Sequence, residues 1–430
     1  MVTANDDPAL FDRQSLISGW DQAKLASACV FIGGRTIAGA YLAWALSAMG
    51  VGSIILAGAP FRAQRFLAWL SGDPRPYPGV NLLEYPSDIE SVWRLTWMVS
   101  SGKVDVVCSA TESAFEAAIL EVVAKDLKVP YCAGTVADGG WCGSTRPTEL
   151  ASHEELLRPW LGITALAVAA QLADRVRQTI NPLPDDVEQE DGHLGMDVPL
   201  AGRPVAGPVA IVGLGAIGTF VGLELSRQYG LFLVDHDRIE LSNMNRQTLF
   251  SADDARAQLH KVTASKKSIR RIVPRATVRK RAQKITSSDS KILRQQRPGV
   301  LISTVDNAKA RIMLQEYGAA HGIPVVQGST GVFAADAYVQ DAHGTSLDEQ
   351  LHGALTTAVD REARTPRERR PGGCAGDPSF CVPGMWAGAM VCRRLVQVSE
   401  GYRGLPAHHW RSGSLPMEAG TARRDGQGVA

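Results

Sequence analysis

Two copies of one sequence pattern constrain the fold of this chain more than any other feature. Each copy has an apolar run of strand type, then glycines, then an apolar pattern typical of a helix; the stretches are CVFIGGRTIAG (Cys29–Gly39) and VAIVGLGAIG (Val209–Gly218). A second pair follows at Val104–Thr135 and Gly299–Thr330, where each stretch predicts a strand, a loop, a helix and another short strand. The chain is therefore predicted to contain two copies of one α/β unit.

Alternating strands and helices of this length predict mostly parallel sheets with helices on both faces. The expected fold class is α/β, as two tandem Rossmann-like domains that pack as an intramolecular pseudo-dimer. We place the first domain at residues 1–180 and the second at residues 205–403. Between them, residues 181–204 are rich in proline, glycine and acid and predict a linker; residues 404–430 lack periodicity and predict a flexible tail.

Composition excludes several classes of protein. The 430 residues carry a net charge of +1, so no global field attracts nucleic acid or an anionic membrane. The seven cysteines are scattered and odd in number, which favours reduced thiols and a cytoplasmic location. One apolar stretch, Tyr41–Pro60, is about as long as a membrane span, but Gly50 and Gly52 interrupt it, so we predict a helix, a turn and a strand and no membrane partner.

One segment, Lys266–Lys284, is strongly basic, although the net charge of the whole chain is close to zero. We do not expect it to bind nucleic acid, because the net charge of the whole chain is close to zero. The acidic linker is a candidate cover for this basic face.

The second copy carries the residue pattern of a nucleotide site. Gly213, Gly215 and Gly218 lie between a predicted strand and a predicted helix, where glycines let the backbone approach a phosphate. Asp235 ends the next strand and is placed to accept hydrogen bonds from a ribose. These residues predict an adenine nucleotide but do not separate NAD from ATP.

Polar residues after Asp235 favour ATP. The run Ser242–Gln247 includes Asn243, Asn245 and Arg246, and Lys261 follows on the next predicted helix. Arg246 and Lys261 supply the cations that a triphosphate needs. Asp306, which ends the strand VLISTVD, is placed to hold Mg²⁺ with Asn307 beside it.

This half resembles the ThiF/MoeB family of adenylyltransferases, which includes the ubiquitin-activating enzymes. The family pattern is a glycine-rich turn, D-x-D-x-(V/I)-x-x-S-N-x-N-R-Q, a lysine and a D-N pair, and it is met here by Gly213–Gly218, Asp235, Asp237, Asn243 to Gln247, Lys261 and Asp306–Asn307. The resemblance implies ATP bound with Mg²⁺, a carboxylate that attacks the α-phosphate, and pyrophosphate that leaves. It implies that Asp235 holds the ribose, that Asn245, Arg246 and Lys261 hold phosphates, and that Asp306 holds the metal.

The resemblance also indicates which substrates and protein partners to expect. It implies that the activated carboxylate belongs to a ubiquitin-like protein, a ribosomally made peptide or a small acid, and it is compatible with a homodimer. Two other functions stay open at this point: a peptide-binding module that has lost turnover, and, less favoured, an NAD-dependent oxidoreductase.

The first copy is predicted to have lost its nucleotide site. Thr36 stands where the second copy has Gly215, Gly58 stands where it has Asp235, and no S-N-x-N-R-Q segment follows. One feature survives, because FDRQ (Phe11–Gln14) resembles the Y-x-R-Q found near the start of these domains. The resemblance makes Arg13 a candidate finger that reaches the γ-phosphate in the other half.

Cysteine chemistry departs from the family. No C-x-x-C pairs occur, so zinc is not expected. Family members that form a thioester use a cysteine, and Cys374, Cys381 and Cys392 are the candidates here, although Cys392 lies on an apolar helical stretch typical of a core.

Overall fold

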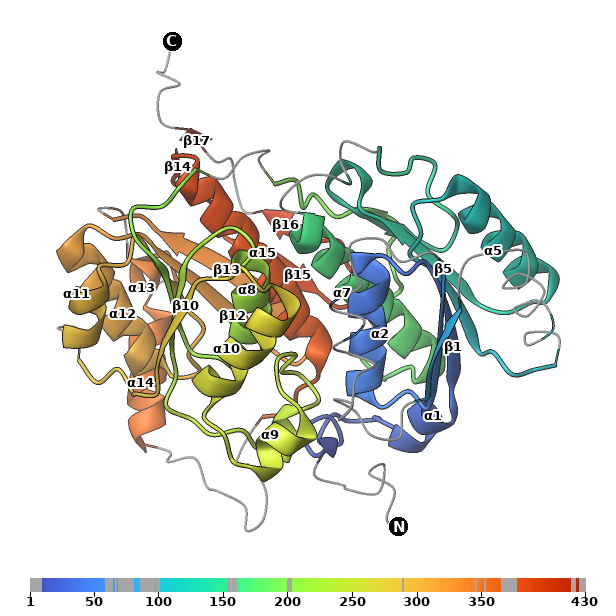
Figure 1. Cartoon of the computed structure of the whole chain (residues 1–430), viewed down its shortest axis with the longest axis horizontal. Helices are drawn as coiled ribbons and strands as arrows, with labels where there is room; N and C mark the ends of the chain where they lie inside the picture. The colour runs from blue at the N-terminus through green and yellow to red at the C-terminus, as the bar shows by residue number, and fades with distance from the viewer. Residues whose placement is uncertain are drawn as a thin grey trace.

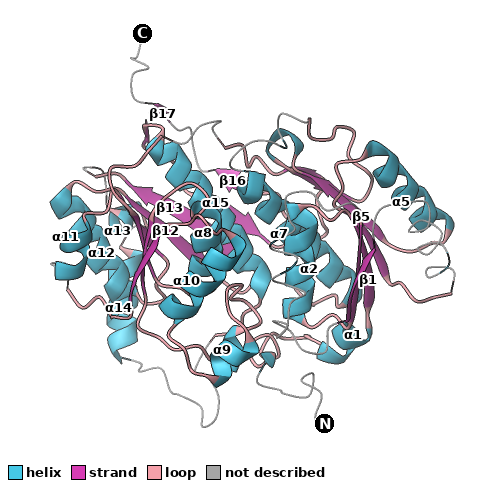
Figure 2. Ribbon diagram, viewed as in Figure 1, coloured by secondary structure: helices cyan, strands magenta, loops and turns pink. Residues whose placement is uncertain are grey.

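The fold consists of two β-sheets with long apolar helices between them (Figures 1 and 2). The computed structural model describes residues 10–58, 65, 68, 81–85, 97, 101–152, 156, 161–198, 203–287, 290–342, 344, 346–351, 353–364, 377–418 and 423–424. One continuous core of buried side chains runs through both halves. The α/β class with largely parallel sheets is confirmed.

The first sheet has the strand order β3-β2-β1-β4-β5-β6-β7. Its first five strands in this order are parallel, and the last two add in antiparallel fashion. The strands are β1 (Cys29–Gly33), β2 (Ser53–Ala57), β3 (Asn81–Tyr85), β4 (Val106–Ser109), β5 (Tyr131–Thr135), β6 (Trp141–Gly143) and β7 (Gly192–His193).

The second sheet repeats this order as β10-β9-β8-β11-β12-β13 and then adds β15 and β16. Its strands are β8 (Val209–Val212), β9 (Leu231–Val234), β10 (Val278–Arg281), β11 (Val300–Ser303), β12 (Val325–Thr330), β13 (Ala334–Gln340), β15 (His408–Arg411) and β16 (Met417–Glu418). A separate pair joins β14 (Tyr402–Arg403) to β17 (Arg423–Arg424). The shared order agrees with the sequence repeat, since each strand–turn–helix stretch takes the same place in its own sheet.

The helices divide into central and peripheral ones. Those between the sheets are α2 (Ile37–Met49), α7 (Leu161–Ile180), α8 (Gly218–Leu225) and α15 (Cys381–Ser399). Those elsewhere are α1 (Gln22–Ser27), α5 (Ala114–Asp126), α9 (Ala252–Arg256), α10 (Lys261–Ile272), α11 (Lys291–Gln296), α12 (Ala308–His321), α13 (Leu347–Gln350) and α14 (Ala354–Arg364), with one-turn 3₁₀ helices at η3 (Ala137–Gly139) and η4 (Leu241–Asn243). Every residue of α2 is buried, which explains why its sequence is apolar on all sides.

The apolar stretch Tyr41–Pro60 contains the end of α2 and the strand β2, as predicted. Gly50 ends the helix in the left-handed conformation, with φ at 82°, and its N–H donates to carbonyls of the last helical turn. That conformation favours glycine. Among the residues that the structure describes, no helix is both long enough and apolar enough to cross a membrane.

Buried polar and aromatic contacts join the two halves. The hydroxyl of Tyr41 on α2 donates to the carboxylate of Glu224 on α8, which Arg227 also pairs at 3.1 Å. Trp44 meets Phe220 edge to face with ring centroids 5.1 Å apart. Because Glu224 is almost completely buried, these partners are needed to offset the desolvation of its charge.

Described residues of the predicted linker, residues 181–204, make contacts with the first half of the chain. Asp186 pairs with the buried Arg177 of α7 at 2.6 Å, and Asp191 pairs with Arg175 at 2.8 Å. Strand β7 joins the first sheet in the same segment. Composition alone does not show these contacts, because they depend on buried arginines of α7.

The first residues of the predicted tail, from residue 404 on, include two strands of the second sheet. Strand β15 pairs with β13, and Trp410 stacks on Trp386 of α15 with centroids 5.6 Å apart. The second sheet therefore extends to Glu418. A strand of four residues is too short to give a periodic signal in the sequence.

Candidate functional site

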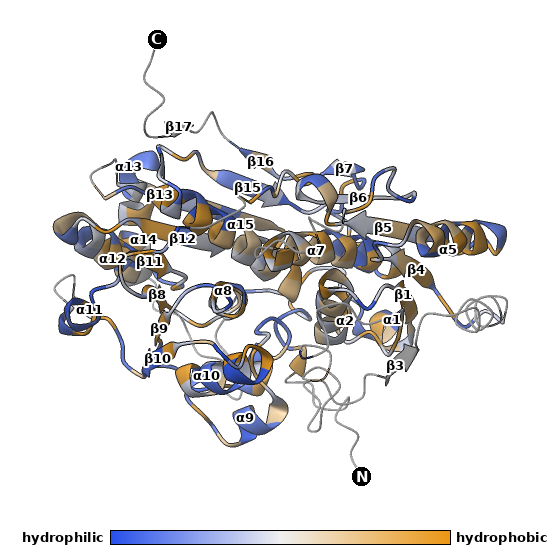
Figure 3. Ribbon diagram, turned by 45° about the horizontal axis from the view of Figure 1, so that its top comes forward, coloured by the Kyte–Doolittle hydropathy of each residue, from blue (hydrophilic) through white to orange (hydrophobic). Residues whose placement is uncertain are grey.

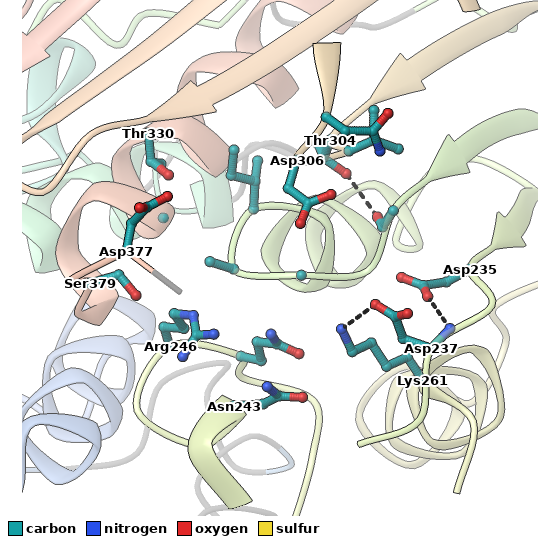
Figure 4. A pocket seen from close by; sticks show the side chains of 18 of the residues that line it. Asp235, Asp237, Asn243, Arg246, Lys261, Thr304, Asp306, Thr330, Asp377 and Ser379 are labelled. Atoms are coloured by element: carbon teal, nitrogen blue, oxygen red, sulfur yellow. Dashed lines mark hydrogen bonds and ion pairs between the residues drawn. The ribbon is translucent and has the colours of Figure 1, made fainter. Parts of the chain in front are cut away.

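A large cavity lies at the carboxyl ends of the parallel strands of the second sheet (Figure 4). Its volume is about 1440 Å³. Its walls come from the turn after β8, the segments after β9 and β11, the end of β12, the start of α15 and the first half of the chain. Parallel α/β sheets place ligands at this edge.

The turn after β8 forms the floor of this cavity. Gly213 has φ at 96°, and a β-carbon there would lie 2.7 Å from the carbonyl oxygen of Thr304. A β-carbon on Gly218 would lie 2.1 Å from the carbonyl oxygen of Gly213. Gly215 differs, because it lines the cavity and a β-carbon on it would meet no atom within 4 Å. The first and third glycines thus allow the tight turn, and Gly215 leaves open space.

Asp235 fixes this turn to the next strand. Its Oδ2 accepts from the N–H of Leu214 at 2.6 Å, and its Oδ1 accepts from the N–H of Asp237 at 2.8 Å. Burial raises the pKa of Asp235, against the opposing effects of Lys261 and the two backbone donors. Each carboxylate oxygen keeps a further lone pair for a hydroxyl donor.

Asp237 and Lys261 form an ion pair at the side of the cavity, with Nζ and Oδ2 3.0 Å apart. Burial raises the pKa of Asp237, but Lys261, His236 and Lys284 together outweigh burial, with Lys261 the largest of the three, so the pKa lies below its usual value. The N–H of Lys261 also donates to the carbonyl of Asp237 at 3.0 Å. The ammonium group is therefore held at the cavity wall.

The segment Ser242–Gln247 begins within the 3₁₀ helix η4, and its side chains make different kinds of contact. The Oδ1 of Asn243 accepts from the N–H of Glu240 at 3.2 Å, which caps this turn. Arg246 lines the cavity and donates to the carbonyl of Ser242 at 2.6 Å and to Oδ1 of Asn245 at 2.8 Å. Figure 4 shows Arg246 on the side of the cavity that faces Asp377 and Ser379.

Asn245 lies beneath the cavity wall. It is fully buried, and its amide donates to the carbonyl of Ser379 at 2.9 Å and to Oε1 of Gln14 at 3.4 Å. These contacts hold Arg246 in place and tie the site to the first half of the chain. Its side chain is thus occupied inside the protein, and the contact between Asn245 and a phosphate stays a prediction.

Gln247 lines the cavity with an unsatisfied atom. The residue is almost completely buried, and its Oε1 has no hydrogen-bond partner among the residues that the structure describes. Buried acceptors are normally satisfied. A ligand or a water molecule in the cavity would satisfy it.

Asp306 and Asn307 follow β11. The side chain of Asn307 accepts from the N–H of Ala310 at 2.8 Å and caps α12, so its amide oxygen is used by the protein. Asp306 is exposed and lines the cavity, and Figure 4 shows its carboxylate on the cavity side of the strand end. Carboxylate oxygens of this kind suit Mg²⁺.

Arg13 brings the first half of the chain into the site. It lines the cavity, and its Nη1 donates to the carbonyl of Asp377 at 3.3 Å. The N–H of Ser379 donates to the carbonyl of Arg13 at 3.1 Å. Arg13 thus lies against residues of the second half, and its role as a finger for the γ-phosphate stays a prediction.

Three cavity residues, Thr330, Asp377 and Ser379, were not singled out from the sequence. Thr330 ends β12, and the other two precede α15. Figure 4 shows their side chains on the wall next to Arg246. No motif marks them, because only the packing of α15 against the sheet brings Asp377 and Ser379 to the cavity.

The described cysteine candidates do not suit a nucleophile. Cys381 is fully buried at the start of α15, its Sγ lies 3.5 Å from the carbonyl oxygen of Ala45, and burial raises its pKa. Burial also raises the pKa of Cys392. A raised pKa leaves the thiol protonated, and the thiolate is the reactive form. Cys374 lies outside the described residues.

The first sheet has the same turn without the open space. Thr36, at the position of Gly215, donates to the carbonyl of Ala110 at 2.8 Å and accepts from the N–H of Gly39 at 3.0 Å. Gly58 takes the place of Asp235. Glu112 takes the place of Asp306, but its carboxylate accepts from Thr135 at 2.7 Å and from the N–H groups of Val136 and Ala151 at 3.1 Å each.

Comparison with known proteins shows a family model that matches most of the second half. Residues 206–395 match the model of the ThiF family. The chain is similar to the sulfur carrier protein ThiS adenylyltransferase of Bacillus subtilis, with 26% identity over 122 residues, which is 28% of this chain and 36% of that protein.

Two solved structures are also similar. Escherichia coli MccB with MccA-N7isoASN gives a TM-score of 0.38 at 16% identity, over 50% of this chain and 64% of that chain. MccB with AMPCPP and MccA gives a TM-score of 0.38 at 17% identity, over 51% of this chain and 65% of that chain. The chain thus spans about a third of the length of the curated relative and just under two thirds of MccB. Residues 206–395 form a ThiF-type domain in the carboxyl-terminal half of the chain.

Proposed function

We propose that this protein is an ATP-dependent adenylyltransferase. It activates a carboxylate as an acyl-adenylate, and the carboxylate belongs to the carboxyl terminus of a ubiquitin-like protein or ribosomally made peptide, or to a small acid. The observation that carries the proposal is that one cavity joins the open glycine turn, Asp235, the cations Arg246, Lys261 and Arg13, and Asp306. The similarity to the ThiS adenylyltransferase supports a carrier protein or peptide as substrate.

The cavity fits ATP in three respects. Gly215 leaves room where a phosphate would approach the helix start. Oε1 of Gln247 is a buried hydrogen-bond acceptor with no donor among the described residues, and a donor group of the ligand would satisfy it. The volume of about 1440 Å³ exceeds the roughly 300–1,000 Å³ of common small-molecule sites, so a second substrate has room beside the nucleotide.

The cavity also fits Mg²⁺ through the oxygen donor of Asp306. When bound, the ion would neutralise charge that develops on the phosphate oxygens. Asp306 would hold it, and Asp235 would hold the ribose.

The residues of the chain then act by positioning and by charge. The substrate carboxylate oxygen forms a bond to the α-phosphorus of ATP, and the bond from this phosphorus to the leaving pyrophosphate oxygen breaks. Arg246 and Lys261 stabilise the negative charge on the phosphates, with Arg246 oriented by Asn245 and Lys261 by Asp237. Arg13 adds a planar cation from the first half.

In this proposal the first half is an inactive copy. Thr36 fills the space that Gly215 leaves open, and the carboxylate of Glu112 is used inside the fold. One chain would thus carry one nucleotide site, and the two halves would act together as a pseudo-dimer.

Carboxylate-dependent exchange of pyrophosphate into ATP tests this function. The full chain is assayed with Mg²⁺ and a panel of candidate carrier proteins, peptides and small acids, beside an Asp306→Ala variant. Exchange that requires a carboxylate and is lost in the variant supports the proposal. Binding of NAD with no binding of ATP overturns it.

A further inference from the structure

The basic segment Lys266–Lys284 is not used by the proposed reaction, apart from Lys284 at the rim of the cavity. It contains nine basic residues and no acidic residue. In the structure it forms most of α10, the following loop and the edge strand β10. Figure 3 shows both hydrophilic and hydrophobic colour along α10.

The cations of this segment lie on the surface. Ile269 and Ile272 of α10 are buried, whereas Lys267, Arg270 and Arg271 are exposed. On β10, Val278 is buried, and Arg279, Lys280 and Arg281 are exposed. We call these six exposed cations, with Arg275 and Lys284, the basic strip.

Among the described residues, the ion pairs give the basic strip a single acidic partner, Asp254. Lys267 pairs with Asp254 at 3.2 Å, while Arg279 and Lys280 donate to the neutral side chains of Gln296 and Thr263. In the acidic segment 181–204, our candidate cover, Asp186 and Asp191 pair instead with arginines of α7. The strip therefore presents a local positive field on a chain with a net charge of only +1.

The strip also includes the free edge of a sheet. Strand β10 is the last strand on its side of the second sheet and pairs only with β9 among the described strands. An edge strand can accept a further strand through its backbone. Three consecutive cations repel the same strand of a second copy, so the edge disfavours self-association and favours a segment of opposite charge.

The composition of the strip favours a protein over a nucleic acid. Residues 266–284 contain no aromatic side chain on which a base could stack. They do contain the unpaired strand edge, which only a polypeptide can extend.

We propose that the basic strip is a docking surface for an acidic protein segment in extended conformation. The partner would place Asp or Glu side chains opposite the arginines and lysines and run along β10. This inference does not depend on the identity of the activated carboxylate.

The test measures binding of a labelled peptide of about ten alternating Glu and Val residues, roughly 33 Å long when extended, to the full chain. Two double variants reverse charge in the strip, Arg270→Glu with Arg271→Glu and Arg279→Glu with Arg281→Glu. A matched control reverses two exposed lysines of the first half, Lys24→Glu with Lys128→Glu. A Lys/Val peptide and a single-stranded oligonucleotide serve as comparison probes.

We expect the acidic peptide to bind at low salt and to bind about tenfold more weakly to both strip variants, with the control unchanged. Salt near 1 M should weaken binding, because screening then acts over about 3 Å. Unchanged unfolding temperatures show that the variants are folded. Absence of peptide binding, equal binding to the strip variants, or tighter strip-dependent binding of the oligonucleotide would overturn the proposal.

Discussion

Asp306 and Glu112 stand at equivalent places in the two sheets, yet their carboxylates have different surroundings. Each lies three residues beyond the fourth strand in the sheet order, and the next residue caps a helix in both cases. The carboxylate of Glu112 accepts three hydrogen bonds from its own half of the chain. Asp306 faces the cavity.

These surroundings predict opposite results for the same substitution. Asp306→Ala should abolish pyrophosphate exchange and change the free energy of unfolding by less than about 0.5 kcal/mol, as exposed substitutions do. Glu112→Ala should keep exchange and lower the free energy of unfolding by about 1–3 kcal/mol, because it leaves donors without an acceptor. Denaturant unfolding and exchange assays on both variants check these two expectations. Loss of exchange in Glu112→Ala but not in Asp306→Ala would contradict them.

Lys261 should matter to ATP more than to stability. The lowered pKa of Asp237 means that the ion pair stabilises the fold above the usual Asp pKa of about 3.9 and that this contribution is lost as pH falls through the lowered pKa. Asp237 is half exposed, so the pair contributes less than about 1 kcal/mol. For Lys261→Met we expect a small loss of stability at pH 7 that vanishes at low pH, and at least about tenfold weaker ATP binding by calorimetry. Unchanged ATP affinity would show that Lys261 does not contact the nucleotide.

At the scale of elements, the glycines of the turn after β8 have different roles: we expect Gly218 to be required for folding, and Gly215 for binding. Gly215→Thr places a side chain in open space and copies Thr36, which caps its own helix. We expect this variant to fold with unchanged stability and to lose ATP binding. Gly218→Ala brings a β-carbon within 2.1 Å of a carbonyl oxygen, so it should destabilise the fold by about 1–3 kcal/mol. Thermal unfolding and calorimetry separate the two, and normal ATP binding by Gly215→Thr would exclude this turn as the phosphate site.

The elements that the sequence predicted well are those with strong local patterns. The two strand–glycine–helix units, the turn at Gly50 and the position of Asp235 all follow from periodicity and turn chemistry. Residues whose place depends on distant packing could not be placed from the sequence. Asn245 is buried because the segment before α15 covers it, and Asp377 reaches the cavity only through that same contact.

At the scale of the whole molecule, the first half contributes Arg13 to the cavity of the second. Arg13 can be changed without loss of the contact between the halves, because Ser379 donates to the backbone carbonyl of Arg13. Arg13→Ala should therefore lower the exchange rate by about 10²-fold or more while the unfolding temperature stays the same. Arg13→Lys keeps the charge but loses the planar fork, so it should restore activity only in part. Full activity of Arg13→Ala would limit the first half to a structural role.

The whole molecule also shows where sequence composition misleads. Residues predicted as linker and tail supply Asp186 and Ser412, which contact the buried Arg177. Short polar segments of this kind have no periodicity, and their burial depends on an arginine far away in the sequence. The two sheets, in contrast, share one strand order, as a sequence repeat leads one to expect.

Calorimetric titration of the full chain with ATP and Mg²⁺ tests the central claim most directly, namely that one nucleotide site lies in the second half. We predict one ATP per chain, no binding to the Gly215→Thr variant, and unchanged stoichiometry for the Glu112→Ala variant. Two ATP molecules per chain, or one that still binds to Gly215→Thr, would contradict the account.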